Sequence, residues 1–369
     1  MNLLLIFTFD ISLKSWEETG LLSRETHIYK VLHEKYGVKT TFLTFGNNDD
    51  LLYSDALKNI DIVPVYKNIK YSKSKLIRFI KSIYFCFKFS SKFKNIDLIK
   101  TNQLSGSWVG ILLKIILSKP LLLRTGFDKV VFLIKEKKSK LKILIYYLLT
   151  QFGLAFSDYY LVSSTSDKKF LEKNYLLFNN KILVNPNWVE NTPIKILNKR
   201  HDKKILMVGR LEKQKNYKKV LKDFSNSDYV FDIVGAGSLQ SEITNLADKN
   251  NTKIKLIGNI QNDILLKKYS DYKFFLSTSL FEGNSKVILE AMGAGCIVFA
   301  TNNSNNREII SHGINGYLFN PADDLLYLLE NLDSDILSEI SNNAVSTIKD
   351  KFSIEAVLDK EMNLINKLI

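Results

Sequence analysis

Two glutamates eight positions apart, Glu282 and Glu290, are the residues of this 369-residue chain best placed to do chemistry. The apolar runs 273–277 and 296–300 predict buried strands on either side of them, and the segment between predicts a crossover helix of a parallel sheet. We expect Glu282 on the loop before this helix and Glu290 two turns inside it, about 12 Å further along the axis. Ligands of such sheets bind at the carboxyl ends of the strands, where Glu282 would lie.

The start of this helix suits a sugar attached to a diphosphate. Backbone amides at a helix N-terminus bind phosphate, and a carboxylate on either side accepts hydrogen bonds from hydroxyl groups. The amides here belong to Asn284, Ser285 and Lys286. A structural interpretation stays open, in which Glu282 is a first-turn acid favoured by the helix dipole and Glu290 lies on a solvated helix face.

Two cations follow another expected strand, 204–208. Arg210 and Lys215 lie on the loop that begins at Gly209, at the carboxyl end of this strand. Arginine binds a diphosphate through a bidentate fork and lysine as a point charge, so this pair would stabilise a diphosphate leaving group without a metal. The alternative is that both are solvent-facing loop charges.

A third loop, 234–238, carries Gly235 and would bring backbone close to a ligand. Its start is that of a dinucleotide-binding loop, but Gln240 stands where the third glycine of that fingerprint is required. No acid with the right context follows at the usual distance. We therefore expect no nicotinamide cofactor.

Short apolar runs alternate with helical patterns along the chain, which predicts the α/β class with two tandem Rossmann-like, doubly wound domains. The length is about twice that of a common domain, which agrees with two domains. The expected strands lie near 2–8, 38–44, 96–101, 120–124, 159–163, 204–208, 229–234, 253–257, 273–277, 296–300 and 316–319. The expected helices include 22–35, 72–94, 106–117, 132–153, 334–350 and 353–367.

Prolines and asparagines in 184–193 predict a linker from there to about residue 202. We expect one domain at 1–185, a second at 186–350, and a C-terminal helix at 351–369 that packs back on the first. Two such sheets would leave a cleft between their carboxyl edges.

The net charge of +14 lies almost entirely in the first half of the chain. Residues 1–150 carry 25 basic and 12 acidic side chains, whereas residues 151–369 carry 27 and 26. In the stretches 67–94 and 129–142, lysines alternate with aromatic and aliphatic residues, a pattern that suits an anionic membrane surface. The alternative is that these runs are solvated helix faces over the core.

The chain has two cysteines, Cys86 and Cys296, one in each half. They predict neither a disulfide framework nor a zinc site, which fits a reducing cytosol. No apolar run approaches the length of a membrane-spanning helix, and the first residues read as a strand rather than as a signal core. We expect a cytoplasmic protein with peripheral contact at the inner face of the membrane.

Four motifs in the second half follow one another in a fixed order. They are Gly209-Arg-Leu with Lys215-Asn216, then Val234-Gly-Ala-Gly, then Glu282-Gly with Leu289-Glu-Ala-Met and Gly295, then Glu308-Ile-Ile with Gly313-Ile-Asn-Gly316. Together they resemble the donor-binding half of the retaining glycosyltransferases of family 4, over about residues 180–330. The resemblance implies the two-Rossmann-domain, B-type fold, with an acceptor-binding first domain and a second domain that binds a nucleotide sugar.

The resemblance also implies roles for single residues. Arg210 and Lys215 would contact the donor diphosphate, Glu282 the transferred sugar, and Glu290 the ribose of the nucleotide. The remaining donor-binding positions would be Gly20, Gly209, Gly235, Gly283, Asn284, Ser285 and Lys286.

The first half matches the family less closely. Gly20 resembles its glycine loop after the first strand, although an ordinary strand-to-helix turn is the alternative. Members often carry a histidine at the end of a mid-domain strand, but here Arg124-Thr-Gly-Phe-Asp128 occupies that place. Arg124 and Asp128 are therefore the candidates on the acceptor side.

These observations predict a retaining glycosyltransferase that moves a hexose-type sugar from a nucleotide diphosphate to a saccharide or lipid-linked acceptor, in surface polysaccharide or glycolipid biosynthesis. We expect no metal, because Asp333-Ser-Asp335 reads as a helix-start cluster rather than as a metal motif. Two alternatives are a nucleotide-sugar epimerase of the same architecture and a non-catalytic basic membrane-binding protein. No nucleic-acid reading module is recognisable, so nucleic acid is not an expected partner.

Overall fold

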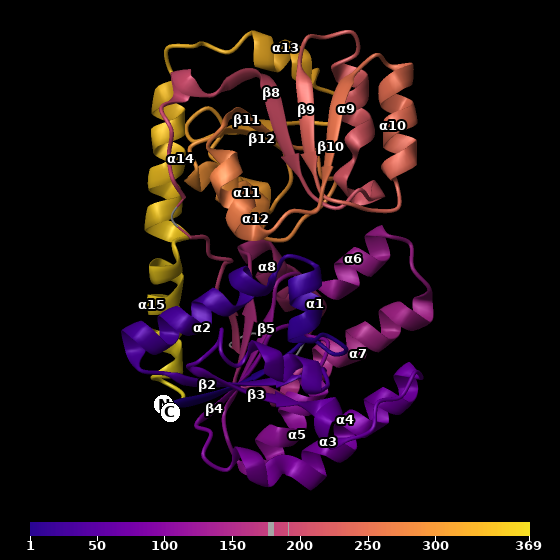
Figure 1. Ribbon diagram of the computed structural model, residues 1–369, viewed down its shortest axis with the longest axis vertical. Coiled ribbons are helices and arrows are strands. Elements are labelled where there is room, and N and C mark those ends of the chain that lie inside the picture. Colours follow the sequence, from indigo (N-terminus) through magenta and orange to yellow (C-terminus); the bar gives the residue numbers. More distant parts are fainter. Residues whose placement is uncertain (176–180, 191) are drawn as a thin grey trace. The chain divides into compact units, whose positions relative to one another are not determined.

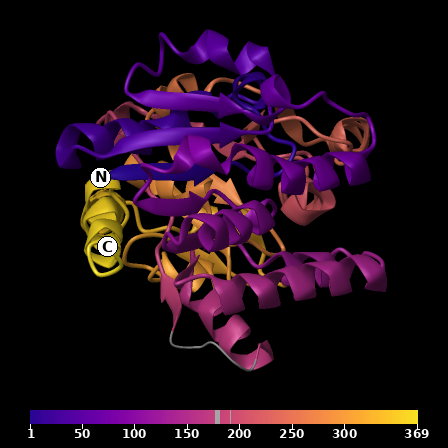
Figure 2. The same cartoon turned by 90° about the horizontal axis from the view of Figure 1, so that it is seen from below.

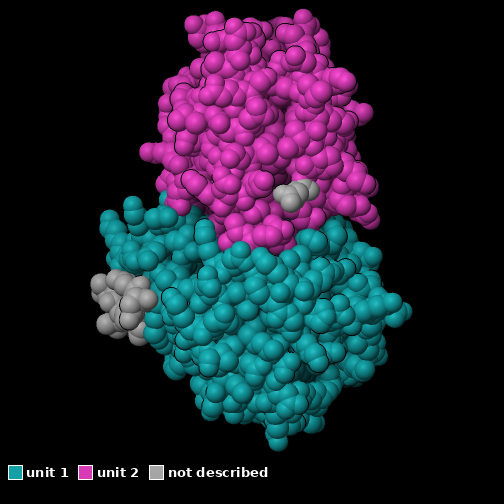
Figure 3. Space-filling model, turned by 90° about the vertical axis from the view of Figure 1, so that its left-hand side faces the viewer, with its two compact units in different colours: residues 1–185, 358–369 teal, residues 186–357 magenta. Residues whose placement is uncertain are grey.

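The computed structural model describes residues 1–175, 181–190 and 192–369 and divides the chain into two compact units (Figures 1 and 3). Unit 1 comprises Met1–Asn185 and Leu358–Ile369, and unit 2 comprises Pro186–Val357. The chain enters unit 2 within the segment predicted as a linker, of which residue 191 lies outside the described residues. It returns to unit 1 inside helix α15 (Ile354–Ile365).

Unit 1 contains a seven-stranded parallel sheet in the order β3-β2-β1-β4-β5-β6-β7. Its strands are β1 (Asn2–Ile6), β2 (Lys39–Thr44), β3 (Ile60–Pro64), β4 (Leu98–Thr101), β5 (Leu121–Thr125), β6 (Tyr159–Val162) and β7 (Ile182–Val184). The central β1 is a run of apolar side chains, and residues 3–6 are fully buried because helices cover both faces of a parallel sheet. The five strands expected here are confirmed, and the two edge strands β3 and β7 are additions.

Helices pack on both faces of this sheet (Figures 1 and 2). They are α1 (Leu13–Glu18), α2 (Leu22–Tyr36), α3 (Val65–Asn68), α4 (Lys75–Phe89), α5 (Ser107–Leu117), α6 (Lys129–Lys135), α7 (Lys140–Phe156) and α8 (Thr165–Asn174). The prediction of one helix over 132–153 is wrong, because α6 ends near Glu136 and α7 begins at Lys140. Lys137 between them has φ of +53°, a left-handed conformation that an α-helix cannot contain.

Unit 2 contains a six-stranded parallel sheet in the order β10-β9-β8-β11-β12-β13. Its strands are β8 (His201–Val208), β9 (Val230–Val234), β10 (Lys253–Gly258), β11 (Tyr272–Ser277), β12 (Ile297–Thr301) and β13 (Tyr317–Phe319). Its helices are α9 (Tyr217–Asp223), α10 (Gln240–Lys249), α11 (Asn262–Tyr269), α12 (Lys286–Gly293), α13 (Leu325–Glu330) and α14 (Leu337–Lys351). All six strands expected in the second half are confirmed.

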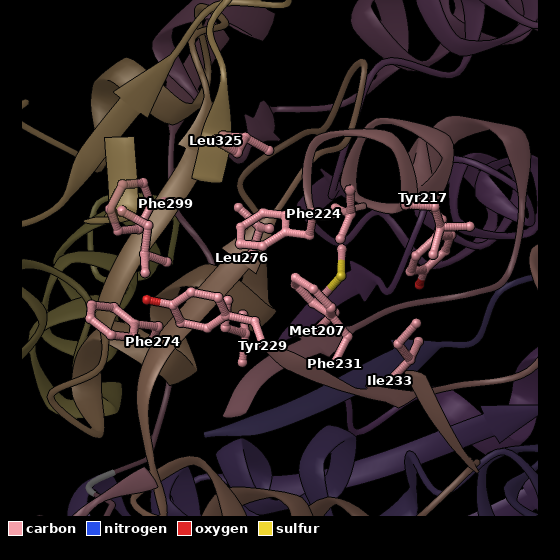
Figure 4. Packing of buried hydrophobic residues seen from close by; sticks show 14 of the residues in the cluster. Met207, Tyr217, Phe224, Tyr229, Phe231, Ile233, Phe274, Leu276, Phe299 and Leu325 are labelled. Carbon is pink, nitrogen blue, oxygen red and sulfur yellow. The ribbon is translucent and has the colours of Figure 1, made fainter. Parts of the chain in front are cut away.

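The core of unit 2 has one apolar layer on each side of this sheet. Figure 4 shows one layer, in which Met207 of β8 and Phe231 of β9 lie with Phe224 from the end of α9. The other layer contains Leu206 and Phe275 with Leu289 of α12. The alternation of sides along each strand follows from the two-residue period of β structure, and it leaves the loops after the strands free to carry polar residues.

Candidate functional site

The ion pair between Lys215 and Glu282 joins two of the predicted functional loops in unit 2. Lys215 Nζ lies 2.5 Å from Glu282 Oε1, and both side chains are mostly buried, with 16% and 12% exposed. Lys215 belongs to the loop after β8, and Glu282 to the loop after β11. These strands are neighbours in the sheet, so their carboxyl ends meet at one edge.

Backbone contacts hold the same two loops together. Leu280 N–H donates to the carbonyl of Gln214 at 2.9 Å, and the Gln214 side-chain amide donates to the carbonyl of Phe281 at 2.7 Å. The Thr278 hydroxyl donates to the Lys215 carbonyl at 2.7 Å. The position of the ion pair is therefore set by the main chain on both sides.

Arg210 lies on the same loop, but its side chain is exposed, and among the described residues it has no ion pair or side-chain hydrogen bond. The structure brings Lys215 and Glu282 together and leaves the Arg210 guanidinium in solvent. An exposed guanidinium is free to turn towards an anionic ligand, whereas the Lys215 ammonium is already held in place.

Two glycines allow the loops after β8 and β9 to touch through their backbones. Gly235 has φ of +134°, and a Cβ added there would lie 2.1 Å from the Gly209 carbonyl oxygen. Gly209 has φ of +155°, and a Cβ there would lie 2.6 Å from Cε of Lys215. A larger residue at position 235 would displace the backbone that carries Arg210, and one at position 209 would displace the end of the Lys215 side chain.

The N-terminus of α12 is fixed by the segment that enters unit 2. Asn187 N–H donates to Oδ1 of Asn284 at 2.9 Å, and the Asn187 side-chain amide donates to the Asn284 carbonyl at 2.5 Å. Ser285 is the N-cap residue, and Lys286 Nζ lies 4.1 Å from the centre of the Trp188 ring. Gly283, Asn284 and Ser285 are buried. The role of residues 187 and 188 was not predicted, although both lie in the segment predicted as a linker.

Glu290 differs from expectation in two respects. The helix begins at Lys286, so Glu290 is its fifth residue, little more than one turn inside it rather than two. Residues 282–285 form a loop instead of a first turn, because Asn284 bonds to Asn187 rather than within the helix. Glu290 is also buried, with 2% exposed, and its Oε2 accepts a hydrogen bond from the Tyr269 hydroxyl at 3.0 Å. The solvated-face interpretation is therefore wrong.

In unit 1, Gly20 ends helix α1 rather than linking a strand directly to a helix. Its φ is +71°, its N–H donates to the Glu17 carbonyl, and the next residue, Leu21, donates to Trp16. A glycine in the left-handed conformation after a helix is a common C-terminal cap. The alternative of an ordinary strand-to-helix turn is therefore wrong, because α1 lies between β1 and α2.

Arg124 and Asp128 lie at the carboxyl end of β5. Arg124 is half-buried and is the penultimate residue of β5. Asp128 is the N-cap of α6, where its Oδ1 accepts from Val131 N–H at 2.8 Å. Asp128 is 5% exposed, and burial raises the pKa of its carboxyl to about 6. The capping bond gives Asp128 a structural function whether or not it also contacts an acceptor.

A buried charge cluster beside Arg124 was not predicted. Lys100 of β4 forms an ion pair with Glu361 of α15, and Asn185 Nδ2 donates to the other Glu361 oxygen at 2.8 Å. Burial lowers the pKa of Lys100, and the positive charge of Arg124 lowers it further, whereas Glu361 raises it. A lysine inside the apolar run of a central strand was the signal in the sequence that could have indicated this pair.

Comparisons with known proteins point to glycosyltransferases. Residues 189–343 match the family described as glycosyl transferases group 1. The chain is 26% identical over 375 residues to the UDP-Gal:alpha-D-GlcNAc-diphosphoundecaprenol alpha-1,3-galactosyltransferase of Escherichia coli, covering 95% of this chain and 92% of that protein. It is 32% identical over 162 residues to a Campylobacter jejuni diphospho-undecaprenol 4-alpha-N-acetylgalactosaminyltransferase, covering 42% of this chain and 44% of the relative.

Solved structures match the whole fold. The Anabaena protein HepE in complex with UDP and glucose has a TM-score of 0.74 at 16% identity, with full coverage of both chains. A sucrose-phosphate synthase from Thermosynechococcus elongatus has a TM-score of 0.79 at 15% identity, covering 100% of this chain and 99% of that one.

The fold and these matches define a class: two Rossmann-like units in tandem, as in the B-type glycosyltransferases. The protein is a glycosyltransferase, and the resemblance to family 4 is confirmed. The epimerase and the non-catalytic interpretations find no support in these matches.

Proposed function

We propose that the protein transfers a hexose-type sugar from a nucleotide diphosphate to a saccharide or lipid-linked acceptor, with retention of anomeric configuration. The observation that carries this proposal is the buried Lys215–Glu282 pair at the edge where β8 and β11 end. In this proposal Lys215 is the cation that binds the diphosphate, and Glu282 is the carboxylate that accepts from the sugar hydroxyls. The Escherichia coli and Campylobacter jejuni relatives are named for transfer to diphosphoundecaprenol-linked sugars, which supports a lipid-linked acceptor.

In the proposed mechanism the acceptor hydroxyl attacks the anomeric carbon from the face that the diphosphate leaves. The bond from the anomeric carbon to the diphosphate oxygen breaks, and that oxygen takes the proton of the acceptor hydroxyl. Lys215 and Arg210 stabilise the negative charge that grows on the leaving diphosphate. No side-chain nucleophile takes part.

Other residues at the carboxyl edge of the unit 2 sheet would position the donor. Glu282 accepts hydrogen bonds from the sugar, and because it already holds Lys215, the sugar and the distal phosphate would lie side by side. Glu290, braced by Tyr269, accepts from the ribose hydroxyls. Backbone contacts to the donor would come from the loops that contain Gly209 and Gly235 and from the start of α12, where the amides and the helix dipole favour a phosphate.

We also propose that no divalent metal is needed, because two cations serve the diphosphate. Among residues 1–175, 181–190 and 192–369, no cluster of three or more His, Cys, Asp or Glu side chains is placed to hold an ion. Asp333 and Asp335 lie on the exposed turn between α13 and α14, where Asp335 N–H donates to Asp333 Oδ1 at 2.9 Å, and neither caps α14, whose N-cap is Ile336.

The experiment is a screen of nucleotide sugars for hydrolysis and for transfer to lipid-linked saccharides, with the product anomer read by NMR. We expect slow hydrolysis of one donor, faster transfer, and an α product from an α donor. A chelator should leave the rate unchanged. Inverted product would exclude the proposed stereochemistry, and strong inhibition by the chelator would exclude the metal-free mechanism.

A second observation favours contact with a membrane surface. Apolar side chains are exposed along helices α4, α5 and α7 of unit 1, and α5 packs against both of the others. The exposed residues are Leu76, Ile77, Ile80, Tyr84 and Phe87 on α4, Ile115 and Ile116 on α5, and Leu141, Leu144, Ile145, Leu148, Phe152 and Phe156 on α7. An exposed apolar surface of this extent marks an interaction site.

The charges around this surface select an anionic bilayer. On α7 the apolar residues recur at helical spacing, and the exposed Lys140 and Lys142 fall on either side of the stripe. On α4 the exposed Lys88 follows the edge of the stripe in the same way. Apolar side chains below the headgroups and lysines at their level are typical of interfacial helices.

In the part of the chain that the structure describes, no helix has the length and apolar character needed to cross a bilayer. We therefore propose peripheral binding through this surface, at the inner face of the membrane.

A further inference from the structure

Unit 2 contains a pocket of about 210 Å³ at the side of its sheet where β13 is the edge strand. Its walls come from Phe299 of β12, from residues 312, 317 and 318 of β13 and the turn before it, and from residues 327, 328 and 331–333 of α13 and the turn after it. Tyr317 is the first residue of β13, and α13 lies at the end of unit 2 where the strands begin (Figure 1). The pocket is therefore away from the carboxyl edge, and none of the residues assigned above to the donor lines it.

The floor of the pocket and one of its walls are aromatic. The Tyr317 ring stacks on the Phe299 ring with centroids 4.9 Å apart, and the His312 ring meets Tyr317 edge to face at 5.7 Å. Phe299 belongs to the core layer of Figure 4, which fixes the ring beneath Tyr317. Tyr327 of α13 also lines the pocket and is 65% exposed. One fixed ring and one exposed ring offer flat apolar surface to a ligand.

The turn that carries His312 is held in place by Asn315, which is 4% exposed. Asn315 Oδ1 accepts from Ser311 N–H at 2.8 Å, and its Nδ2 donates to Thr347 Oγ1 at 3.1 Å. His312 Nδ1 lies 3.1 Å from the backbone nitrogen of Leu318, so the ring is attached to β13 and Nε2 remains for a ligand. A wall that is fixed before binding loses little entropy when the ligand arrives.

Polar groups surround the aromatic surface. The hydroxyls of Tyr317 and Tyr327 form no hydrogen bond with a residue that the structure describes. Asn331 Nδ2 donates to the Tyr327 carbonyl at 2.8 Å, which leaves Asn331 Oδ1 as an acceptor. Asp333 Oδ1 accepts from Asp335 N–H at 2.9 Å, which leaves Oδ2. Burial raises the pKa of Tyr317, and the charge of Asp333 raises it further, which agrees with a carboxylate close to this ring.

The composition of the walls selects the ligand. No lysine or arginine is among the described residues that line the pocket, and the Asp333 carboxylate would repel a phosphate. An ammonium ligand would use the rings and the carboxylate but leave the hydroxyl and amide groups without partners. A pyranose ring has an apolar face and a rim of hydroxyls, which matches both parts of the lining. The volume is below the roughly 300–1,000 Å³ of sites for drug-sized ligands, so it suits one sugar ring rather than a nucleotide.

We propose that this pocket is a second saccharide site, which holds one neutral sugar residue of a longer saccharide on Tyr317 and Tyr327, with its hydroxyls bonded to Asn331 and Asp333. The choice of a saccharide rests on the glycosyltransferase function proposed above. The site takes no part in the bond that breaks or forms. It would keep a saccharide chain attached to the enzyme and so raise its effective concentration.

The test uses the full-length protein and saturation-transfer NMR with the neutral disaccharides lactose, maltose, cellobiose and N,N′-diacetylchitobiose. The variants are Tyr327→Ala, which removes the exposed ring, and Asp333→Asn, which removes the charge. Asp335→Asn is the matched control for the charge, because Asp335 lies on the same exposed turn outside the pocket. Ile264→Ala is the control for the ring, since Ile264 is a similarly exposed side chain of unit 2, also outside the pocket. Thermal melting verifies that each variant is folded.

We expect at least one disaccharide to give a signal with the wild type and with both controls. Tyr327→Ala should abolish this signal. Asp333→Asn should weaken binding about tenfold, the effect of one hydrogen bond to a charged group. Excess UDP should leave the signal in place, because the nucleotide is assigned to the carboxyl edge of the sheet.

The proposal is overturned if no disaccharide binds, if UDP displaces the bound disaccharide, or if Tyr327→Ala and Asp333→Asn bind like the wild type. Equal loss in Asp333→Asn and Asp335→Asn would also overturn it, because the effect would then come from the turn or the net charge. Failure of the general function is a separate result. If a disaccharide binds in a Tyr327-dependent manner while the wild type turns over no nucleotide sugar, the second site stands and the transferase proposal fails.

Discussion

Lys215 and Glu282, 67 positions apart in the chain, form a 2.5 Å ion pair that joins the loops after β8 and β11. Both side chains are largely removed from solvent, so the pair is screened less than one on the surface. Arg210, on the same loop as Lys215, is exposed. Lys215 therefore has a structural role in the ion pair that Arg210 does not share. Substitution of each cation can separate this structural role from the stabilisation of the leaving diphosphate.

We expect Arg210→Ala and Lys215→Ala each to lower turnover by about 10²–10³, because each removes a charge that stabilises the leaving diphosphate. Lys215→Ala should also lower the melting temperature, since it leaves the Glu282 carboxylate buried without its partner. Arg210→Ala should melt like the wild type. Lys213→Ala, an exposed lysine on the same loop, is the control and should change neither quantity. Wild-type turnover in both variants would exclude the leaving-group role.

Glu290→Gln should weaken nucleotide binding while the protein stays folded. The amide oxygen can still accept from the Tyr269 hydroxyl, but the charge-assisted bonds to the ribose are lost, at about 1.5–3 kcal/mol each. Calorimetry with UDP measures the affinity. Tyr269→Phe, which keeps the carboxylate and removes its brace, should have a smaller effect. Equal affinity of Glu290→Gln and wild type would contradict the assignment.

The exposed surface of α4, α5 and α7 should bind anionic vesicles at low salt and release them as salt rises. Replacing Lys135, Lys137, Lys138 and Lys140 by glutamine should weaken binding by about 1 kcal/mol for each lysine that reaches the headgroups. Leu144→Ser should weaken it also, because it removes an apolar contact. Co-sedimentation with vesicles is the measurement.

The control for this experiment replaces four exposed lysines of unit 2, Lys203, Lys204, Lys253 and Lys255, by glutamine. It makes the same change in net charge and should leave vesicle binding nearly unchanged. Equal loss in both quadruple variants would mean that net charge, rather than this surface, binds the vesicles. Donor affinity should be unaffected throughout.

The Lys100–Glu361 pair should matter strongly for the stability of unit 1. Glu361→Gln leaves the Lys100 ammonium buried without a counter-charge, and we expect a loss of about 3–5 kcal/mol in the free energy of unfolding. The double variant Lys100→Met with Glu361→Leu should recover most of this loss, since it buries no charge. Urea denaturation measures both. If Glu361→Gln has the same free energy of unfolding as the wild type, solvent reaches the Lys100 ammonium.

The raised pKa of the Asp128 carboxyl predicts that the stability of the protein depends on pH. Burial raises the pKa of its carboxyl from 3.8 to about 6, so the folded protein holds this proton more tightly than the unfolded chain. Its stabilising contribution is therefore complete below about pH 4 and is lost as the pH rises through 6. Asp128→Asn keeps the helix cap and removes the titration. The stability difference between wild type and variant should change by no more than about 3 kcal/mol between pH 4 and 7.5.

The sequence alone determined the α/β class, the eleven strands expected from apolar runs, and the loops that carry the donor-side residues. These features are local, because a strand buried on both faces, such as β1 or β12, must be apolar throughout, and glycines such as Gly209 and Gly235 mark sharp turns after strands. The edge strand β7 and the break at Lys137 were missed, since a three-residue strand and a single left-handed residue leave little pattern.

Only the tertiary structure decided which of these residues meet. The expectation that Glu290 is two turns along the helix assumed that the helix begins directly after Glu282, but Asn284 bonds to Asn187, 97 positions away, and the helix starts at Lys286. Glu361 and Lys100 are 261 positions apart, and nothing local indicates that a lysine of one strand has a carboxylate from α15 as its partner. Periodicity predicts which face of an element is buried, whereas the partners of a buried polar group depend on how the elements pack.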